Sequence, residues 1–189
     1  LLGARRAFAF DVSAACSSFV VALATARAHV AAGLSRRALV VSAEAFTYGV
    51  DWADPASACF FGDGAGAVVV GRADDPAPRG GGGRPELLDV ALWSEHSDNI
   101  RTGLGGTAAL LASQRLNGHA AVPAPGAEDY PYFFQDGPAV YRDLVPVVVD
   151  LTRELLARHG LPPEGVRSYL LHQASAVMID AVERRLLGF

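Results

Sequence analysis

The sequence predicts an α/β fold in which helices cover a mainly parallel sheet. An apolar run at residues 7–12 precedes a stretch with helical spacing at 17–32, and a second apolar run follows at 38–42. Strand, helix and strand within about 35 residues form a βαβ unit, whose two strands are parallel. The chain has 189 residues, 51% of them hydrophobic, which is enough apolar surface for such a core.

The first helix and the elements after it have recognisable boundaries. Residues 17–32 carry apolar side chains at roughly helical spacing, and Gly33 is a typical C-terminal stop. Residues 44–59 are predicted to form a loop, and 65–70 a strand. The glycines of "GDGAG" precede that strand and do not match G-x-G-x-x-G, so they predict a structural turn with close backbone approach instead of a phosphate site.

The remaining elements follow a Pro/Gly/Arg-rich stretch at 74–85, which predicts an exposed connector. A strand is expected at 86–95 and an irregular insertion at 96–135, which we expect to shape a substrate entrance. The predicted remainder is a helix at 136–159 with Asp136 as N-cap, a kink at Pro146 and an end at Gly160, then a buried strand at 168–173 and an amphipathic helix at 174–188.

Composition excludes several classes of function. The formal charge of −4 and a pI near 5.7 do not indicate the excess of basic residues that is typical of nucleic-acid-binding proteins. Two cysteines do not make a disulfide framework, so a reducing, cytoplasmic compartment is expected. No uncharged run approaches the roughly 20 residues of a membrane span, and no histidine or cysteine pair has metal-ligand spacing, so neither a membrane nor a metal site is predicted.

Cys16 is the candidate nucleophile. It lies among small side chains in "FDVSAACSSF", where a predicted strand gives way to a predicted helix. Unpaired N–H groups at a helix start favour a thiolate and can stabilise an oxyanion, and small neighbours leave room for a substrate carbonyl. The alternative is a small buried cysteine that fills a gap between helix and sheet, and Cys59, in an apolar run, has only that interpretation.

His172 is the candidate partner of Cys16. It ends the apolar run "YLLH" immediately before a predicted helix, the same kind of position as that of Cys16. Open α/β sheets bind ligands beyond the carboxyl ends of their strands, so the two side chains can converge for acyl transfer. A single histidine after an apolar strand can also be purely structural, and that interpretation applies to the histidines at 29, 96, 119 and 159.

Three motifs in order, "AFDVSAACSSF", "FFGDGAGAVVVG" and "LLHQAS", make the chain resemble the thiolase-fold condensing enzymes, specifically the β-ketoacyl-acyl-carrier-protein synthase III family. The resemblance implies an incomplete thiolase-like fold with parts of both βαβαβ halves, lacking the N- and C-terminal segments. It places the end of the first half at 1–75, a flexible connector at 76–86 and the start of the second half at 87–189.

The resemblance also implies the chemistry. Cys16 would take an acyl group from a thioester of coenzyme A or acyl carrier protein, and His172 would assist decarboxylative condensation with a malonyl thioester, in fatty acid or polyketide biosynthesis. Phe61 would line the acyl pocket, Tyr141 would lie near the pantetheine arm, and Ala174 would line the same tunnel. No bound cofactor is implied, and a homodimer is expected.

Departures from the family pattern leave alternatives open. The family's catalytic asparagine is expected beyond the last residue of this chain, and Pro55 occupies the position of an arginine that contacts the coenzyme A nucleotide. A carrier-protein donor therefore remains open. So do an acyltransferase that passes the acyl group to a hydroxyl or amine without condensation, and a non-catalytic partner subunit.

Overall fold

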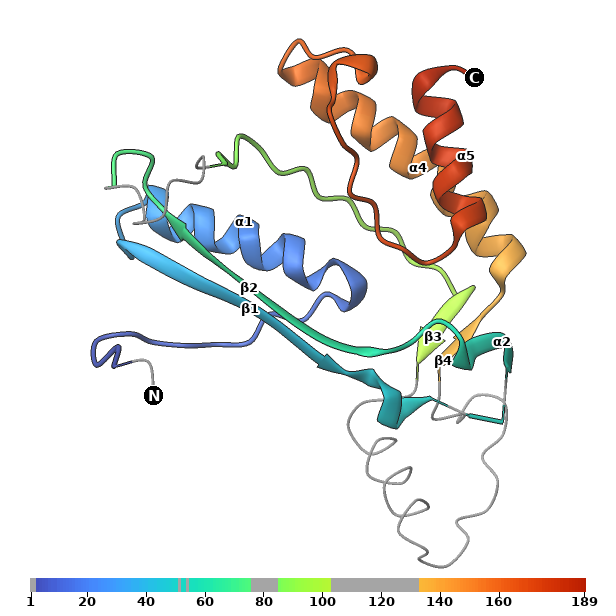
Figure 1. Ribbon diagram of the computed structural model, residues 1–189, viewed down its shortest axis with the longest axis horizontal. Helices are drawn as coiled ribbons and strands as arrows, with labels where there is room; N and C mark the ends of the chain where they lie inside the picture. The colour runs from blue at the N-terminus through green and yellow to red at the C-terminus, as the bar shows by residue number, and fades with distance from the viewer. Residues whose placement is uncertain (1–2, 51, 54, 76–84, 103–132) are drawn as a thin grey trace, which may run out of the picture. The chain divides into compact units, whose positions relative to one another are not determined.

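The computed structural model describes residues 3–50, 52–53, 55–75, 85–102 and 133–189 (Figure 1). The chain divides into two compact units. The first consists of Leu1–Ala43 and Ala65–Leu92, and the second of Glu44–Gly64 and Trp93–Phe189. The predicted limits of the two thiolase halves stay a prediction.

The first unit contains the helix predicted after Cys16. A single 3-10 turn, η1 (Ala15–Ser17), leads directly into α1 (Ser18–Ala31). Ala32 is the C-cap of α1 and its N–H donates to the Ala28 carbonyl, and Gly33 follows with a φ of +72°. A left-handed residue at this position is usually glycine because it lacks the Cβ that would clash. The predicted helix and its stop are confirmed.

Two long strands follow. The strands β1 (Arg37–Ala45) and β2 (Asp63–Gly71) hydrogen-bond to each other as a two-stranded sheet, and in Figure 1 they run in opposite directions. Both strands were expected, and both are longer than the apolar runs that predict them. The predicted parallel pairing concerns residues 7–12 and 38–42, and it is not the pairing of this sheet, whose two strands are β1 and β2.

The strands predicted at 7–12 and 86–95 are not found. Both segments lack strand hydrogen bonds, although 7–12 runs in the same direction as β1 in Figure 1, as a βαβ connection requires. Phe8 and Phe10 are 62% and 57% exposed and stack on each other. An extended segment becomes a strand only when a second strand pairs with it, and among the described residues none does.

The glycines of "GDGAG" do not form the predicted turn. Most of the motif belongs to β2, and none of its glycines is among the residues with positive φ. A Cβ added at Gly62, Gly64 or Gly66 would meet no atom within 4 Å, so no close backbone approach explains them. Close contact occurs instead at Gly71, where an added Cβ would lie 3.0 Å from the side-chain oxygen Oδ2 of Asp75.

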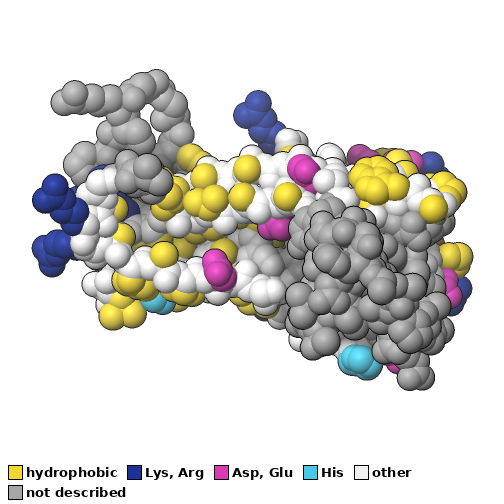
Figure 2. Space-filling view, turned by 90° about the horizontal axis from the view of Figure 1, so that it is seen from below, with side chains coloured by type: hydrophobic (Ala, Val, Ile, Leu, Met, Phe, Trp, Pro, Cys, Tyr) yellow, Lys and Arg dark blue, Asp and Glu magenta, His cyan; other side chains and the backbone are white. Residues whose placement is uncertain are grey.

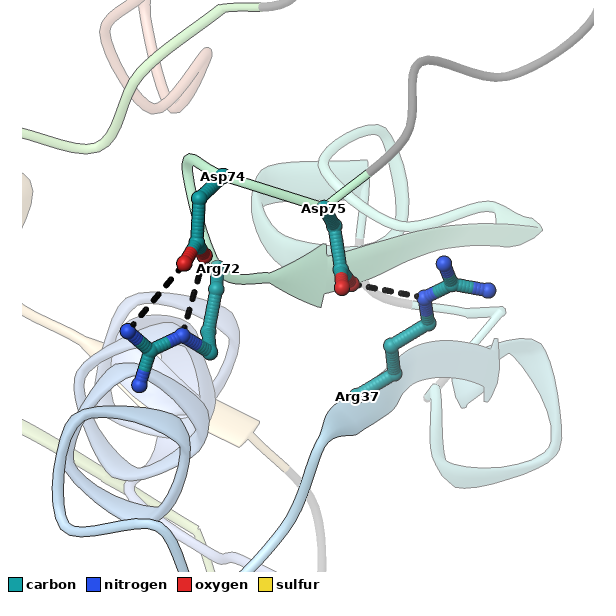
Figure 3. Close-up of polar contacts among 4 residues, drawn as sticks. All are labelled: Arg37, Arg72, Asp74 and Asp75. Atoms are coloured by element: carbon teal, nitrogen blue, oxygen red, sulfur yellow. Dashed lines mark hydrogen bonds and ion pairs between the residues drawn. The ribbon is translucent and has the colours of Figure 1, made fainter.

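Two ion pairs lie beside the end of β2, and one of them, Arg37–Asp75, ties this segment to the start of β1. Arg37 Nε donates to Asp75 Oδ2 at 2.9 Å, and Arg72 Nε donates to Asp74 Oδ1 at 2.9 Å (Figure 3). The hydrogen bond and charge of Arg72 hold the pKa of Asp74 below its ordinary value, and Asp74 raises the pKa of Arg72 in return. Residues 76–84 of the predicted connector lie outside the described residues.

The second unit begins with two short helices, η2 (Phe46–Gly49) and α2 (Pro55–Ala58), within the stretch predicted as loop. The N–H and the hydroxyl of Thr47 both donate to the carboxylate of Asp63, the first residue of β2. The strands β3 (Ile100–Thr102) and β4 (Phe133–Gln135) pair antiparallel. They lie within the predicted insertion and were not foreseen, and residues 103–132 lie outside the described residues.

A long helix, α4 (Gly137–Arg158), is the largest element of the second unit. Asp136 caps it as predicted, since its carboxylate accepts from the Ala139 N–H at 3.0 Å. The helix continues through Pro146 to a left-handed Gly160, and the expected kink at Pro146 stays a prediction.

The core of the second unit lies between α4 and α5 (Ala176–Leu187), which ends at a left-handed Gly188 as expected. Four buried side chains form its centre: Val145, Val149, Val182 and Leu186. Valines at 145 and 149 lie one helical turn apart on α4, so both point to the same face. The amphipathic character of both helices is confirmed, but the apolar spacing of the sequence does not single out Val145 and Val149 as the buried positions of α4.

The predicted strand at 168–173 is extended but unpaired among the described residues. Tyr169 and Leu171 pack against the core between α4 and α5, while Leu170 is 96% exposed. This alternation is the side-chain pattern of a strand.

Large hydrophobic side chains are also widespread on the face shown in Figure 2.

Candidate active site

Cys16 is exposed and occupies the middle of η1, immediately before α1. The residue before it, Ala15, has a φ of +47° and is the only described residue other than glycine with a positive φ. A left-handed alanine costs about 1 kcal/mol or more, because its Cβ approaches the following carbonyl oxygen. Such strain persists where surrounding contacts hold it, and it concentrates at functional sites.

Hydrogen bonds among residues 14–18 hold this turn. The Ser17 N–H donates to the Ala14 carbonyl at 3.0 Å, and the Ser18 N–H donates to the Ala15 carbonyl. The Ser18 Oγ adds two more bonds, accepting from the Ala14 N–H at 2.8 Å and donating to the Ala15 carbonyl at 2.7 Å. The backbone on both sides of Cys16 is therefore fixed by bonds formed within five residues.

The N–H of Cys16 has no acceptor among the described residues. It belongs to the free N–H groups that a helix start presents, at the positive end of the α1 dipole. A thiol and a free N–H on one residue suit attack on a carbonyl, since the N–H can donate to the oxygen that becomes negative. The exposure of Cys16 contradicts the alternative of a buried, gap-filling cysteine.

His172 lies on the extended segment before α5, three residues ahead of its N-cap, Ser175. Its side chain is exposed, on the same side of the segment as Leu170. The segment is anchored beside it by Leu171 and by Tyr169, whose hydroxyl donates to the Pro163 carbonyl at 2.8 Å. Burial raises the pKa of Tyr169, and the negative charge of Glu164 acts in the same direction.

The three residues assigned to substrate binding all belong to the second unit. Phe61 is half-buried and stacks on Phe46, with ring centroids 4.5 Å apart. Tyr141 packs against the core between α4 and α5, and Ala174 is half-buried at a bend just before α5. Their roles in binding stay predictions.

The structure brings together some of the predicted site residues. His172 and Ala174 lie on one segment of the second unit, whereas Cys16 belongs to the first unit. The convergence of Cys16 with His172 therefore stays a prediction. Sequence reasoning missed Ala15 and Ser18. The serine two positions after the cysteine was a usable signal, because serine hydroxyls bond readily to backbone groups three or four residues earlier.

Among residues 3–75 and 85–189, apart from the undescribed gaps, no three histidine, cysteine, aspartate or glutamate side chains are grouped so as to hold a metal ion. In the same part of the chain, no helix has the length and apolar character needed to cross a membrane.

Known sequences identify the family. The family model described as 3-oxoacyl-[acyl-carrier-protein (ACP)] synthase III matches residues 10–81, which include Cys16 and β2. The β-ketoacyl-[acyl-carrier-protein] synthase III of Gloeobacter violaceus is 37% identical over 190 residues, covering 98% of this chain and 52% of the relative. That of Synechococcus sp. WH7803 is 38% identical over 193 residues, covering 98% and 50%. The chain thus spans about half the length of the curated relatives it matches.

Solved structures agree with the sequence relatives. The 3-oxoacyl-(acyl carrier protein) synthase III of Pseudomonas aeruginosa PAO1 matches with a TM-score of 0.71 at 32% identity, over 95% of this chain and 49% of that one. The priming β-ketosynthase of the R1128 polyketide pathway matches with a TM-score of 0.65 at 32% identity, over 97% and 49%. The predicted α/β, thiolase-like fold is confirmed, and the chain belongs to the 3-oxoacyl-[acyl-carrier-protein] synthase III family of condensing enzymes.

Proposed function

We propose that the protein forms carbon–carbon bonds from thioesters, by acyl transfer to Cys16 followed by decarboxylative Claisen condensation with a malonyl thioester. One observation carries the proposal: an exposed thiol with a free backbone N–H lies in a strained turn at the start of α1. Membership of the synthase III family, whose matched residues include this turn, supports it.

In the first half-reaction, the Cys16 thiolate attacks the carbonyl carbon of an acyl thioester. The carbonyl π electrons move to the oxygen, and the Cys16 N–H, free in this structure, donates to that oxyanion. Collapse of the intermediate reforms the carbonyl and expels the donor thiolate, which takes a proton. The product is an acyl thioester on Cys16, with no net oxidation or reduction.

In the second half-reaction, a malonyl thioester loses carbon dioxide, and the electrons of the broken bond form an enolate. His172, exposed on its segment, is the proposed donor to the enolate oxygen. The enolate carbon then attacks the acyl carbonyl on Cys16 and expels the thiolate. A 3-oxoacyl thioester leaves, and the cysteine is ready for another cycle.

The proposed substrates are thioesters of coenzyme A and of acyl carrier protein, with no bound cofactor. Phe61 is proposed to line the acyl pocket, and Tyr141 and Ala174 the channel for the pantetheine arm. Phe61 is half-buried against Phe46, as an apolar pocket wall requires. We further propose a cytoplasmic homodimer, as is usual in the family, acting in fatty acid or polyketide biosynthesis.

The test is turnover by the full-length protein with acyl-coenzyme A or acyl carrier protein as primer and malonyl carrier protein as extender. We expect release of carbon dioxide and a 3-oxoacyl product, both abolished in Cys16→Ser. Acylation of Cys16 without carbon dioxide release would instead support transfer to a hydroxyl or amine. No acylation by intact protein that another subunit requires for activity would support a non-catalytic partner.

A further inference from the structure

Ser18 is the side chain that connects the two residues before Cys16. Its Oγ accepts from the Ala14 N–H at 2.8 Å and donates to the Ala15 carbonyl oxygen at 2.7 Å. The backbone N–H of Ser18 donates to the same carbonyl. One hydroxyl therefore spans the left-handed residue, and the segment that it closes contains Cys16.

These bonds are not ordinary helix capping. A capping side chain accepts from an N–H two or three residues later in the helix, whereas both partners of the Ser18 hydroxyl lie before Cys16. Ser17, which occupies the N-cap position of α1, makes no capping bond with its side chain. The hydroxyl of Ser18 is thus directed at the turn and not at the helix.

The location of the bonds explains how a strained alanine persists. Rotation about φ of Ala15 turns the Ala14 N–H relative to the Ala15 carbonyl, so it would break one of the two bonds to Ser18. The Ala15 carbonyl shares its peptide plane with the Cys16 N–H. Holding that plane therefore sets the direction of the N–H that is proposed to donate to the oxyanion.

We infer that Ser18 is a positioning residue for the nucleophile: its hydroxyl holds Ala15 in the left-handed conformation and thereby fixes the direction of the Cys16 N–H and side chain. The inference rests on the proposed function, because it assigns the purpose of the strain to acyl transfer at Cys16. Misplacement of a reacting group by about 1 Å can cost on the order of 100-fold in rate, so such a device has a measurable effect.

The test uses single-turnover acylation of Cys16 in the full-length protein, followed by mass spectrometry. Ser18→Ala is expected to slow acylation about tenfold or more, because the turn relaxes. Ser18→Thr keeps the hydroxyl and is expected to retain most of the rate. Ser17→Ala removes the neighbouring exposed hydroxyl and should stay within about twofold of wild type, as surface substitutions usually do.

A glycine rescue separates positioning from general loss of structure. Glycine adopts positive φ without a Cβ clash, so Ala15→Gly introduced into Ser18→Ala should recover acylation to within about threefold of wild type. A merely structural role of Ser18 would not be rescued there. Denaturant unfolding of each variant serves as the control for folding and should show the same midpoint as wild type to within the effect of a surface substitution.

Crystal structures of the variants supply a readout independent of activity. The inference predicts a negative φ at Ala15 in Ser18→Ala and a positive φ at the substituted glycine of the double variant. It is overturned if Ser18→Ala acylates within about twofold of wild type, if Ala15 keeps its positive φ there, or if glycine gives no rescue. Wild-type protein that never acylates would contradict the proposed function instead, and the φ of Ala15 in Ser18→Ala would still decide the role of the hydroxyl.

Discussion

The two segments that carry the proposed catalytic side chains are held in different ways. Around Cys16, hydrogen bonds among residues 14–18 fix the backbone. They include two bonds of the Ser18 hydroxyl, to the Ala14 N–H and to the carbonyl of the strained Ala15. Around His172, the backbone is extended and unpaired among the described residues, and it is anchored by the packing of Tyr169 and Leu171.

The conformation of one segment therefore depends on local bonds, and that of the other on tertiary packing. Five consecutive residues hold the Cys16 turn, so substitutions elsewhere in the chain should have little effect on its conformation. The direction of His172 depends on the alternation of its segment, which in turn depends on the core between α4 and α5. Substitutions in that core should therefore affect the condensation step more than the acylation step.

The largest expected effect comes from His172→Ala. It should reduce formation of the 3-oxoacyl product by about 10²–10⁴-fold, the range for loss of a proton-donating catalytic group, while Cys16 still becomes acylated. Product formation is measured by chromatography and acylation by intact mass. His96→Ala is the matched control, since its side chain is 88% exposed. Equal loss of both half-reactions would contradict the separation of roles.

Val145→Ala should have the largest effect on stability. Val145 is fully buried in the core between α4 and α5, and its truncation should lower the free energy of unfolding by about 2 kcal/mol. Condensation should then be lost at a lower temperature than acylation of Cys16. Val177→Ala, at a position 67% exposed on α5, is the control for denaturant unfolding. Simultaneous loss of both half-reactions would show that the two segments are not independently held.

Tyr169→Phe should have a smaller effect, about 0.5–1 kcal/mol, because it removes one hydrogen bond to the Pro163 carbonyl. Burial raises the pKa of Tyr169, so the unfolded chain loses the phenol proton first as the pH rises. The stabilisation is fully present below about pH 10 and is lost as the pH rises through the folded-state pKa. Urea unfolding of wild type and variant should therefore converge at high pH, and a gap that widens would contradict this assignment.

Asp74→Asn should have the smallest effect. Its ion pair with Arg72 is exposed on both sides, and such pairs contribute little. The pKa of Asp74 is lowered, so any stabilisation exists above the unfolded carboxyl pKa and disappears as the pH falls through the folded value. We expect no measurable change in melting temperature at neutral pH and none in the acylation rate. A clear drop in acylation would show that the Cys16 turn depends on contacts outside residues 14–18.

The sequence predicts the helices of this fold well and the sheet poorly. Periodicity and end signals locate α1, α4 and α5 closely, because helix hydrogen bonds are local. The apolar runs locate β1 and β2 but not their antiparallel pairing, since pairing depends on partners distant in sequence. The runs at 7–12, 86–95 and 168–173 are extended without a partner among the described residues.

The candidate site shows the same limit at the level of single residues. Cys16 and His172 are recognised because each follows an apolar run and precedes a helix. The left-handed conformation of Ala15 gives no sequence signal of its own, because alanine does not favour positive φ. The motif "GDGAG" led to the opposite error, since its glycines suggest a turn but lie mostly within β2.

The central claim is that Cys16 is the acyl acceptor, and peptide mapping after incubation with an acyl thioester tests it most directly. Cys59 provides an internal comparison in the same protein. It is also exposed, but it follows the last residue of α2 and so does not lie at the start of a helix. The account predicts acyl mass on the peptide that contains Cys16, none on the peptide that contains Cys59, and none on either in Cys16→Ser. Equal acylation of the two cysteines, or undiminished acylation of Cys16→Ser, would contradict it.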